Sequence, residues 1–291
     1  MSTPVRLAVF GLGLLVAFAA AWGVGTAMGP VLDDDPAASH DMEMGDDDAG
    51  HEQAAHLPGG LLVSQDGYTL SLAETTIKPG TRPLAFTITG ADGEPVTDFD
   101  IEHEKQLHLI AVRRDGSGYQ HVHPVLGDDG TWRTDLDLVP GAWRVFADFT
   151  PDGGEGLTLG ADVTVPGQVG STPAARTATT EVDGYTVTID GHLTDGSSSD
   201  VTVAVERDGE PVTDLEPYLG AFGHLVALRA GDLAYLHVHP EESGPGPKVP
   251  FVAEVPSAGD FHLYFDFQHD GVVRTAQFLI SAEEGGSHDD H

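Results

Sequence analysis

The 291-residue sequence contains no cysteine. This excludes disulfide bonds, thiolate metal sites, a blue-copper centre with its thiolate ligand, and the cysteine through which a lipoprotein is anchored. Basic residues are scarce, with 13 Lys and Arg against 47 Asp and Glu, a formal net charge of -34. Because phosphate binding requires Lys and Arg, we expect no nucleic-acid partner. No nucleophile elbow, phosphate loop or dinucleotide fingerprint occurs, and we expect no enzyme.

One long apolar segment lies at the N-terminus. Arg6 precedes an uncharged run that ends near Val31, and three aspartates follow it. As a helix, this run is long enough to cross the roughly 30 Å hydrocarbon core of a membrane. A basic flank stays in the cytoplasm, so the rest of the chain is expected outside it. We therefore predict a membrane anchor or signal segment over 1–31, with secretion after cleavage near Ala20 as the alternative.

The remaining chain is an internal repeat between two acidic, histidine-containing segments. Gly-Glu-Pro-Val-Thr-Asp occurs at 93–98 and again at 209–214. The repeat predicts two domains. The full division is an acidic His- and Met-containing linker at 32–58, repeat 1 at 59–166, a linker at 167–178, repeat 2 at 179–282 and an acidic tail at 283–291.

Each repeat has the pattern of a β protein. Short runs such as LAFTIT, AWRVFADF, VTVAVE and FHLYFDF alternate apolar and polar residues and are rich in Val, Thr, Phe and Tyr. Turn-forming residues separate them at roughly ten-residue intervals. We predict an all-β protein with two tandem Ig-like sandwiches behind the N-terminal transmembrane helix, and a cupredoxin-like barrel as the alternative fold.

Three histidines keep one spacing, H-x12-H-x-H-P, in both repeats: His108, His121 and His123, then His224, His237 and His239. Asp115-Gly116 lies midway in the first copy and predicts a two-residue type I′ hairpin. Gly231-Asp232 predicts a type II′ turn in the second. Both turns give a register that gathers each set of histidines on one strand face, next to apolar neighbours. Each hairpin is therefore predicted to hold one metal ion.

Asp148 and Asp266 recur on an otherwise aromatic strand in each repeat. Each is a candidate fourth ligand, a hydrogen-bond acceptor that fixes a histidine tautomer, or an outward-facing surface residue. All-imidazole sites suit copper, zinc, nickel and cobalt, and the order of divalent affinities favours copper. Met42 and Met44 in the linker agree with copper, and zinc is the alternative.

The stretches HLIAVRRD, YQHVHP and AWRVFADF, and their second copy through LAYLHVHP, resemble the YtkA-like and FixH-like Ig-like modules. They also resemble uncharacterised heavy-metal-associated proteins of actinobacteria that are anchored in the membrane. This resemblance covers both repeats and implies an extracytoplasmic β-sandwich linked to copper handling, but it supplies no activity.

Three functions remain open. The first is an extracytoplasmic copper chaperone, buffer or sensor, held in the cell membrane by one span and served by a copper-transport partner protein. The second is a structural or adhesive tethered Ig-like protein, in which the histidines only pack and no metal binds. The third, a metal-dependent hydrolase, lacks a convincing general base beyond Asp148 or Asp266, and two small sandwiches leave little room for a cleft. A histidine patch that acts as a pH switch is not separated from these by the sequence.

Overall fold

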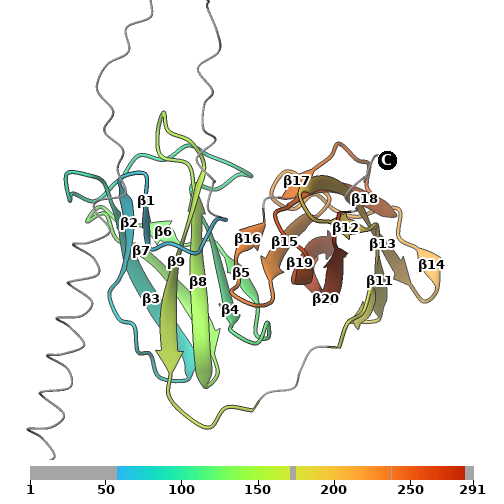
Figure 1. The fold of residues 1–291 in the computed structure, drawn as a ribbon, viewed down its shortest axis with the longest axis horizontal. Helices are drawn as coiled ribbons and strands as arrows, with labels where there is room; N and C mark the ends of the chain where they lie inside the picture. Colours follow the sequence, from blue (N-terminus) through green and yellow to red (C-terminus); the bar gives the residue numbers. More distant parts are fainter. Residues whose placement is uncertain (1–57, 171–174, 237, 286–291) are drawn as a thin grey trace, which may run out of the picture. The chain divides into compact units, whose positions relative to one another are not determined.

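The computed structural model describes residues 58–170, 175–236 and 238–285 (Figure 1). Over these ranges the secondary structure is all β, and no helix is long or apolar enough to cross a membrane. The predicted membrane segment at 1–31 lies outside the described residues, as does His237. The two sandwiches described below belong to one compact unit.

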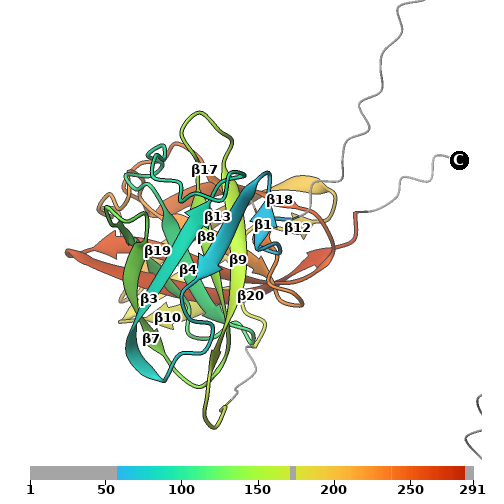
Figure 2. The same ribbon diagram turned by 90° about the vertical axis from the view of Figure 1, so that its left-hand side faces the viewer.

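The first sandwich consists of two sheets (Figure 2). One has the order β1-β2-β3-β7-β6 and the other β5-β4-β8-β9. The strands are β1 Ser64–Gln65, β2 Tyr68–Leu72, β3 Gly80–Thr89, β4 His108–Arg113, β5 Gln120–Val122, β6 Val125–Leu126, β7 Trp132–Leu138, β8 Gly141–Phe149 and β9 Leu157–Val165. Side chains alternate across each strand, and the inner set, including Phe86, Leu109 and Trp132, forms the core between the sheets.

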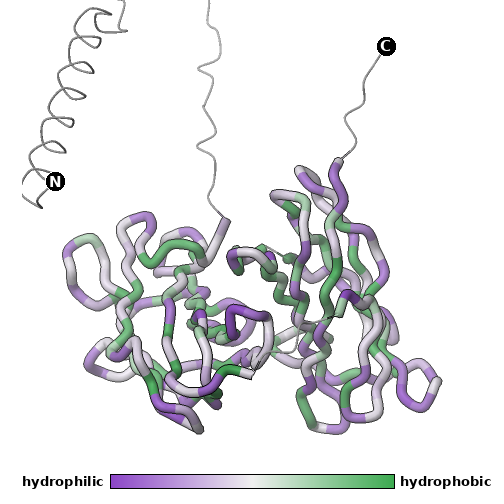
Figure 3. The backbone as a smooth tube through the Cα atoms, turned by 60° about the horizontal axis from the view of Figure 1, so that its bottom comes forward, coloured by the Kyte–Doolittle hydropathy of each residue, from purple (hydrophilic) through white to green (hydrophobic). Residues whose placement is uncertain are grey.

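The second sandwich repeats this plan. Its sheets have the orders β10-β11-β13-β18-β17, with β14 paired to β13, and β12-β20-β19-β15-β16. The strands are β10 Thr179–Val182, β11 Tyr185–Asp190, β12 Leu193–Thr194, β13 Ser197–Arg207, β14 Glu210–Pro211, β15 His224–Arg229, β16 Tyr235–Leu236, β17 Val238–Pro240, β18 Lys248–Val255, β19 Gly259–His269 and β20 Val272–Glu283. Apolar stretches follow the strands, and hydrophilic residues are frequent in the loops (Figure 3).

The strand order identifies the sandwiches as Ig-like. In the first, β2, β3, β7 and β6 correspond to the A, B, E and D strands of an immunoglobulin domain, and β5, β4, β8 and β9 to C′, C, F and G. The prediction of tandem Ig-like sandwiches is thereby confirmed, and the cupredoxin-like barrel is not what forms.

The outer faces of the two histidine-bearing sheets are buried against each other. Ile110 and Val112 of β4 form one apolar cluster with Val226 and Leu228 of β15, and tyrosines from both repeats complete it. Every residue of β4 after His108 is buried, since Leu109 and Ala111 face the sandwich core and their neighbours face the other repeat. The apolar neighbours that the sequence predicts beside the histidines are thus buried between the two repeats.

The predicted register holds where the two strands of each hairpin pair, but the pairing does not extend to His123 or His239, and both predicted turn types are wrong. Ile110 pairs with His121 and Ala227 with Leu236, as the registers require. In the first hairpin Gly116 has a positive φ and Asp115 does not, and the Gly116 N–H donates to Arg113 O, which gives a type I turn with a left-handed glycine. In the second, a four-residue loop closes with Leu233 in the left-handed region at φ 62°.

Candidate metal centre

A two-residue turn precedes each histidine-bearing strand and fixes the first imidazole. In the first repeat, Glu102 and Lys105 exchange two backbone hydrogen bonds of 2.9 Å across His103 and Glu104, both with positive φ. The carbonyl oxygen of Glu102 accepts a bond from His108 Nε2 at 3.1 Å. Because a carbonyl only accepts, the His108 proton sits on Nε2 and the lone pair on Nδ1.

The second repeat builds the same device. Tyr218 and Ala221 close a turn whose residues Leu219 and Gly220 have positive φ. The Tyr218 carbonyl accepts a hydrogen bond from His224 Nε2 at 2.8 Å. His224 is therefore held in the same tautomer as His108, and the lone pair on its Nδ1 is available to a metal ion.

A carboxylate of the second repeat orients His121 of the first. Asp266 Oδ2 lies 2.9 Å from His121 Nδ1, and these side chains are only 3% and 6% exposed. The other Asp266 oxygen accepts the Thr275 hydroxyl at 2.5 Å. Since an ionised carboxylate only accepts, Nδ1 of His121 carries the proton and Nε2 carries the lone pair.

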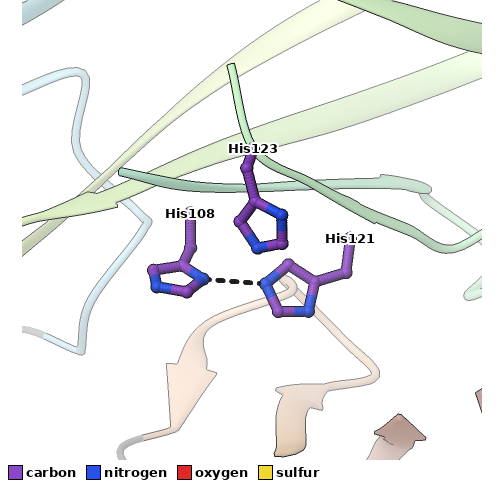
Figure 4. Close-up of side chains that lie close together, drawn as sticks. All are labelled: His108, His121 and His123. Carbon is purple, nitrogen blue, oxygen red and sulfur yellow. Dashed lines mark hydrogen bonds between the residues drawn. The ribbon is translucent and has the colours of Figure 1, made fainter. Parts of the chain in front are cut away.

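Two lone pairs consequently face each other. His108 Nδ1 lies 3.0 Å from His121 Nε2 (dashed in Figure 4), and in the neutral rings neither atom has a proton to donate. His123 turns its ring toward the same point, and its Nε2 is buried without a hydrogen-bond partner. Such an arrangement lacks a cation, either a proton on one of the rings or a metal ion among them.

The spacing of the three rings fits a metal ion. One ligand atom from each of His108, His121 and His123 lies within 4.8 Å of the others. The ring centroids are 5.3, 5.0 and 4.9 Å apart. A tetrahedral ion about 2.0–2.1 Å from each nitrogen would place the ring centroids about 5 Å apart. The triad could therefore supply three ligands of a tetrahedral site and would leave the fourth coordination position to another ligand.

Burial favours the neutral form of three histidines at the site. Loss of solvent around the rings lowers the pKa of His108 to about 4 and that of His123 to about 3. The same cause lowers the pKa of His224 to about 4. A neutral imidazole is the form that binds a metal, so at neutral pH these three rings require no deprotonation before an ion binds.

The triad borders a cavity of about 510 Å³ between the repeats. Its lining includes His103, His108 and His121 from the first repeat, and His224 and His239 from the second. The size of the sandwiches predicts little room for a cleft in this protein. The room exists because it lies between the two sandwiches, which neither repeat alone would show.

The structure distributes the predicted site residues unequally. His108, His121 and His123 converge, and Asp266 and His224 join them from the second repeat. His239 does not lie opposite His224 on one hairpin as predicted, because β17 pairs with β18 in the other sheet and His239 faces Val252 there. His237 lies outside the described residues.

Asp148 and Asp266 occupy equivalent positions. Asp148 pairs with His108 across β4 and β8, and Asp266 pairs with His224 across β15 and β19. Each accepts a threonine hydroxyl from the following strand, and Asp148 lines the cavity. Of the three predicted roles for Asp266, its bond to His121 matches the acceptor that fixes a tautomer.

Two further residues at the site were missed in the sequence. His103 lies 5.1 Å from His224 between ring centroids, and the Tyr218 ring lies 5.8 Å from His224. His103 has no counterpart in the second repeat, where Leu219 stands, so the repeat pattern gave it no weight. The available signal was its place in a turn five residues before His108.

Comparisons with known proteins give a family but no function. The family model described as Domain of unknown function (DUF8832) matches residues 63–167 and 180–284. No curated protein matches the chain. The resemblance to YtkA-like and FixH-like modules is not tested by these matches and stays a prediction.

Several solved structures are similar to the chain at low identity. A DUF4426 family protein from Pseudomonas aeruginosa is 10% identical over 35% of this chain and 94% of that one, with a TM-score of 0.27. The Yersinia pseudotuberculosis adhesin InvE is 13% identical over 75% and 59%, with a TM-score of 0.24. The Escherichia coli adhesin FdeC is 15% identical over 77% and 65%, with a TM-score of 0.26. The chain thus matches less than two thirds of each adhesin structure, and TM-scores this low bear on neither its function nor its partners.

Proposed function

Because the chain belongs to the family described as Domain of unknown function (DUF8832), of which it carries two copies, we propose a function from geometry alone: the protein binds a transition-metal ion. The triad His108, His121 and His123 holds the ion, and Asp266 orients His121. The observation that carries this proposal is that His108 Nδ1 and His121 Nε2 face each other at 3.0 Å beside His123 Nε2, which is buried without a hydrogen-bond partner.

Copper is the ion we favour, and zinc is the alternative. The donors are imidazole nitrogens, with carboxylate in support, and the chain has no cysteine thiolate to offer. All four methionines lie before residue 45, so the described residues contribute no thioether. Nitrogen donors of this kind bind divalent copper most tightly among the first-row ions.

The cellular role follows the expectation from the N-terminal segment. The protein would act outside the cytoplasm, held at the cell membrane by residues 1–31 or released from it, as a copper chaperone, buffer or sensor. A copper-transport protein is the partner such a role requires. The net charge of -34 supports it physically, because an acidic surface raises the local concentration of cations.

Calorimetric titration of the metal-stripped full chain with Cu(II) and Zn(II) tests the proposal. The variant His121→Gln removes the ring that both Asp266 and His108 contact, and should weaken binding at least about 100-fold if His121 is a ligand. His192→Gln is the matched control, because His192 is an exposed histidine of the second repeat. Binding that is absent in the wild type, or equal in both variants, would overturn the metal proposal.

The alternative from the sequence, a structural or adhesive Ig-like protein, retains a specific observation in its favour. The repeats bury an apolar cluster against each other, and tandem packing of that kind stiffens an extended protein. On this alternative, His121→Gln would change stability alone and no ion would bind.

A further inference from the structure

We infer that one ion is held by both repeats at once, with His224 of the second repeat as the fourth ligand, so that metal binding ties the two sandwiches together. This inference rests on the proposed function and replaces the two separate hairpin sites predicted from the sequence. It assigns the fourth coordination position to His224, which comes from the other side of the cavity.

His224 is prepared for this role by its surroundings. Its Nε2 is occupied by the Tyr218 carbonyl at 2.8 Å, so that only Nδ1 can bind an ion. Its ring centroid lies 6.4 Å from that of His121. A tetrahedral site requires about 5 Å between centroids, so the separation of His121 and His224 would shorten by more than 1 Å when His224 joins the shell.

The other candidate ligands fit less well. His103 lies 6.1 Å from His108 between ring centroids, but it is exposed at the tip of a two-residue turn. His239 belongs to β17, in the sheet that pairs away from the histidine-bearing hairpin. His224, by contrast, is half-buried and opens the strand whose outer face packs on the first repeat.

The contact between the repeats is already built around the triad. Asp266 of β19 binds His121 of β5, and the Tyr119 hydroxyl donates to the same carboxylate oxygen at 3.4 Å. The Tyr119 and Tyr264 rings stack with centroids 4.0 Å apart. An ion bound by His121 and His224 would add a coordinate link to this contact and stabilise the docked arrangement by its own binding free energy.

Electron paramagnetic resonance of the Cu(II)-loaded full chain counts the ligands directly. We expect one Cu(II) per chain with four coupled nitrogens in the wild type and three in His224→Gln, with affinity about tenfold or more lower. His192→Gln should match the wild type. Denaturation in chelator checks that His224→Gln is folded before its spectrum is compared.

The outcomes separate the two ideas. No binding by the wild type overturns the proposed function and this inference with it. Binding lost in His121→Gln but unchanged in His224→Gln leaves the metal site standing and overturns the shared site. Two ions per chain, one of which disappears in each variant, also overturns it and restores separate sites.

Hydrogen exchange gives a second measurement that does not depend on a variant. With Zn(II) added, amides of the loop 230–234 should exchange more slowly, because Leu233 is buried in the contact between repeats. The exposed turn at Gly209 serves as an internal reference whose exchange should not change. Unchanged exchange in the loop at saturating Zn(II) would overturn the tie between the repeats.

Discussion

In the first repeat, the chain leaves the hairpin sheet after Val122, and His123 remains beside His108. In the second repeat it leaves after Leu236, and His239 enters the opposite sheet on β17. Two copies of one motif therefore end in different places, although His108 and His224 are held by equivalent turns. The crossing between sheets, which the histidine spacing does not encode, decides where the last histidine goes.

The difference turns two equal motifs into complementary halves. The first repeat gathers three imidazoles, and the second provides the carboxylate of Asp266 and the ring of His224. A repeat that kept full symmetry would place two like clusters face to face. Divergence at a few positions instead yields one asymmetric centre at the contact, and each prediction below tests one part of that asymmetry.

The largest effect is expected from loss of the contact between repeats. Leu228 is fully buried there, so Leu228→Ala should lower the free energy of unfolding by about 2–5 kcal/mol. Chemical denaturation measures this, with Val125→Ala as control, because Val125 is 71% exposed and should change stability by less than about 0.5 kcal/mol. If the two variants behaved alike, the outer faces would not be buried in solution.

Acid should destabilise the metal-free protein through the cluster. Burial lowers the folded-state pKa of His108 and His224 from 6.5 to about 4. Between those pH values the unfolded chain binds more protons than the folded chain, so the free energy of unfolding decreases as the pH is lowered. At pH 5 each ring should contribute a loss of up to about 2 kcal/mol relative to pH 7. Unfolding in chelator from pH 7 to 5 measures it. His108→Gln should reduce the slope, and a flat profile in the wild type would contradict buried, neutral rings.

The carboxylate of the second repeat should tune the affinity of the first repeat's triad. Asp266→Asn keeps the shape but weakens the acceptor for His121 Nδ1, and should lower metal affinity about 10–100-fold. Asp214→Asn makes the same change at another carboxylate–imidazole pair, 3.1 Å from His269 Nε2, and should leave affinity within about twofold. Equal effects would mean that charge, and not the bond to His121, controls binding.

Much of the fold could be predicted from the sequence. Alternating runs such as LAFTIT and FHLYFDF form β3 and β19, and the midpoint of each histidine pair gave the right register for Ile110 and Ala227. Period-two patterns and turn positions are local properties, so a single chain displays them. The turn types failed because Leu233, which is not a turn-forming residue, adopts the left-handed conformation, and because Asp115 does not.

The site formed by residues of both repeats could not be predicted from the sequence, because it depends on packing between the repeats. Val112 and Leu228 look like edge residues of a half-exposed strand, and only the docked partner shows that both faces of β4 are covered. The partnership of His121 with Asp266 spans 145 positions and follows no spacing rule. His103 was visible only as an exception to the repeat, and such exceptions at a contact between repeats merit attention as candidate ligands.

The smallest expected effect distinguishes the two hairpin turns. Gly116 has a φ of 80°, and a Cβ there would lie 2.2 Å from the buried His262 ring, so Gly116→Ala should lower the free energy of unfolding by more than about 1 kcal/mol. Gly231 has no positive φ and open space around it, and Gly231→Ala should raise stability by about 0.4–1 kcal/mol, because the unfolded chain loses freedom. Thermal or chemical unfolding of both variants measures the pair. Opposite signs are expected because only the first turn presses its glycine against the other repeat, and a shared sign would mean that the turns are equivalent in solution.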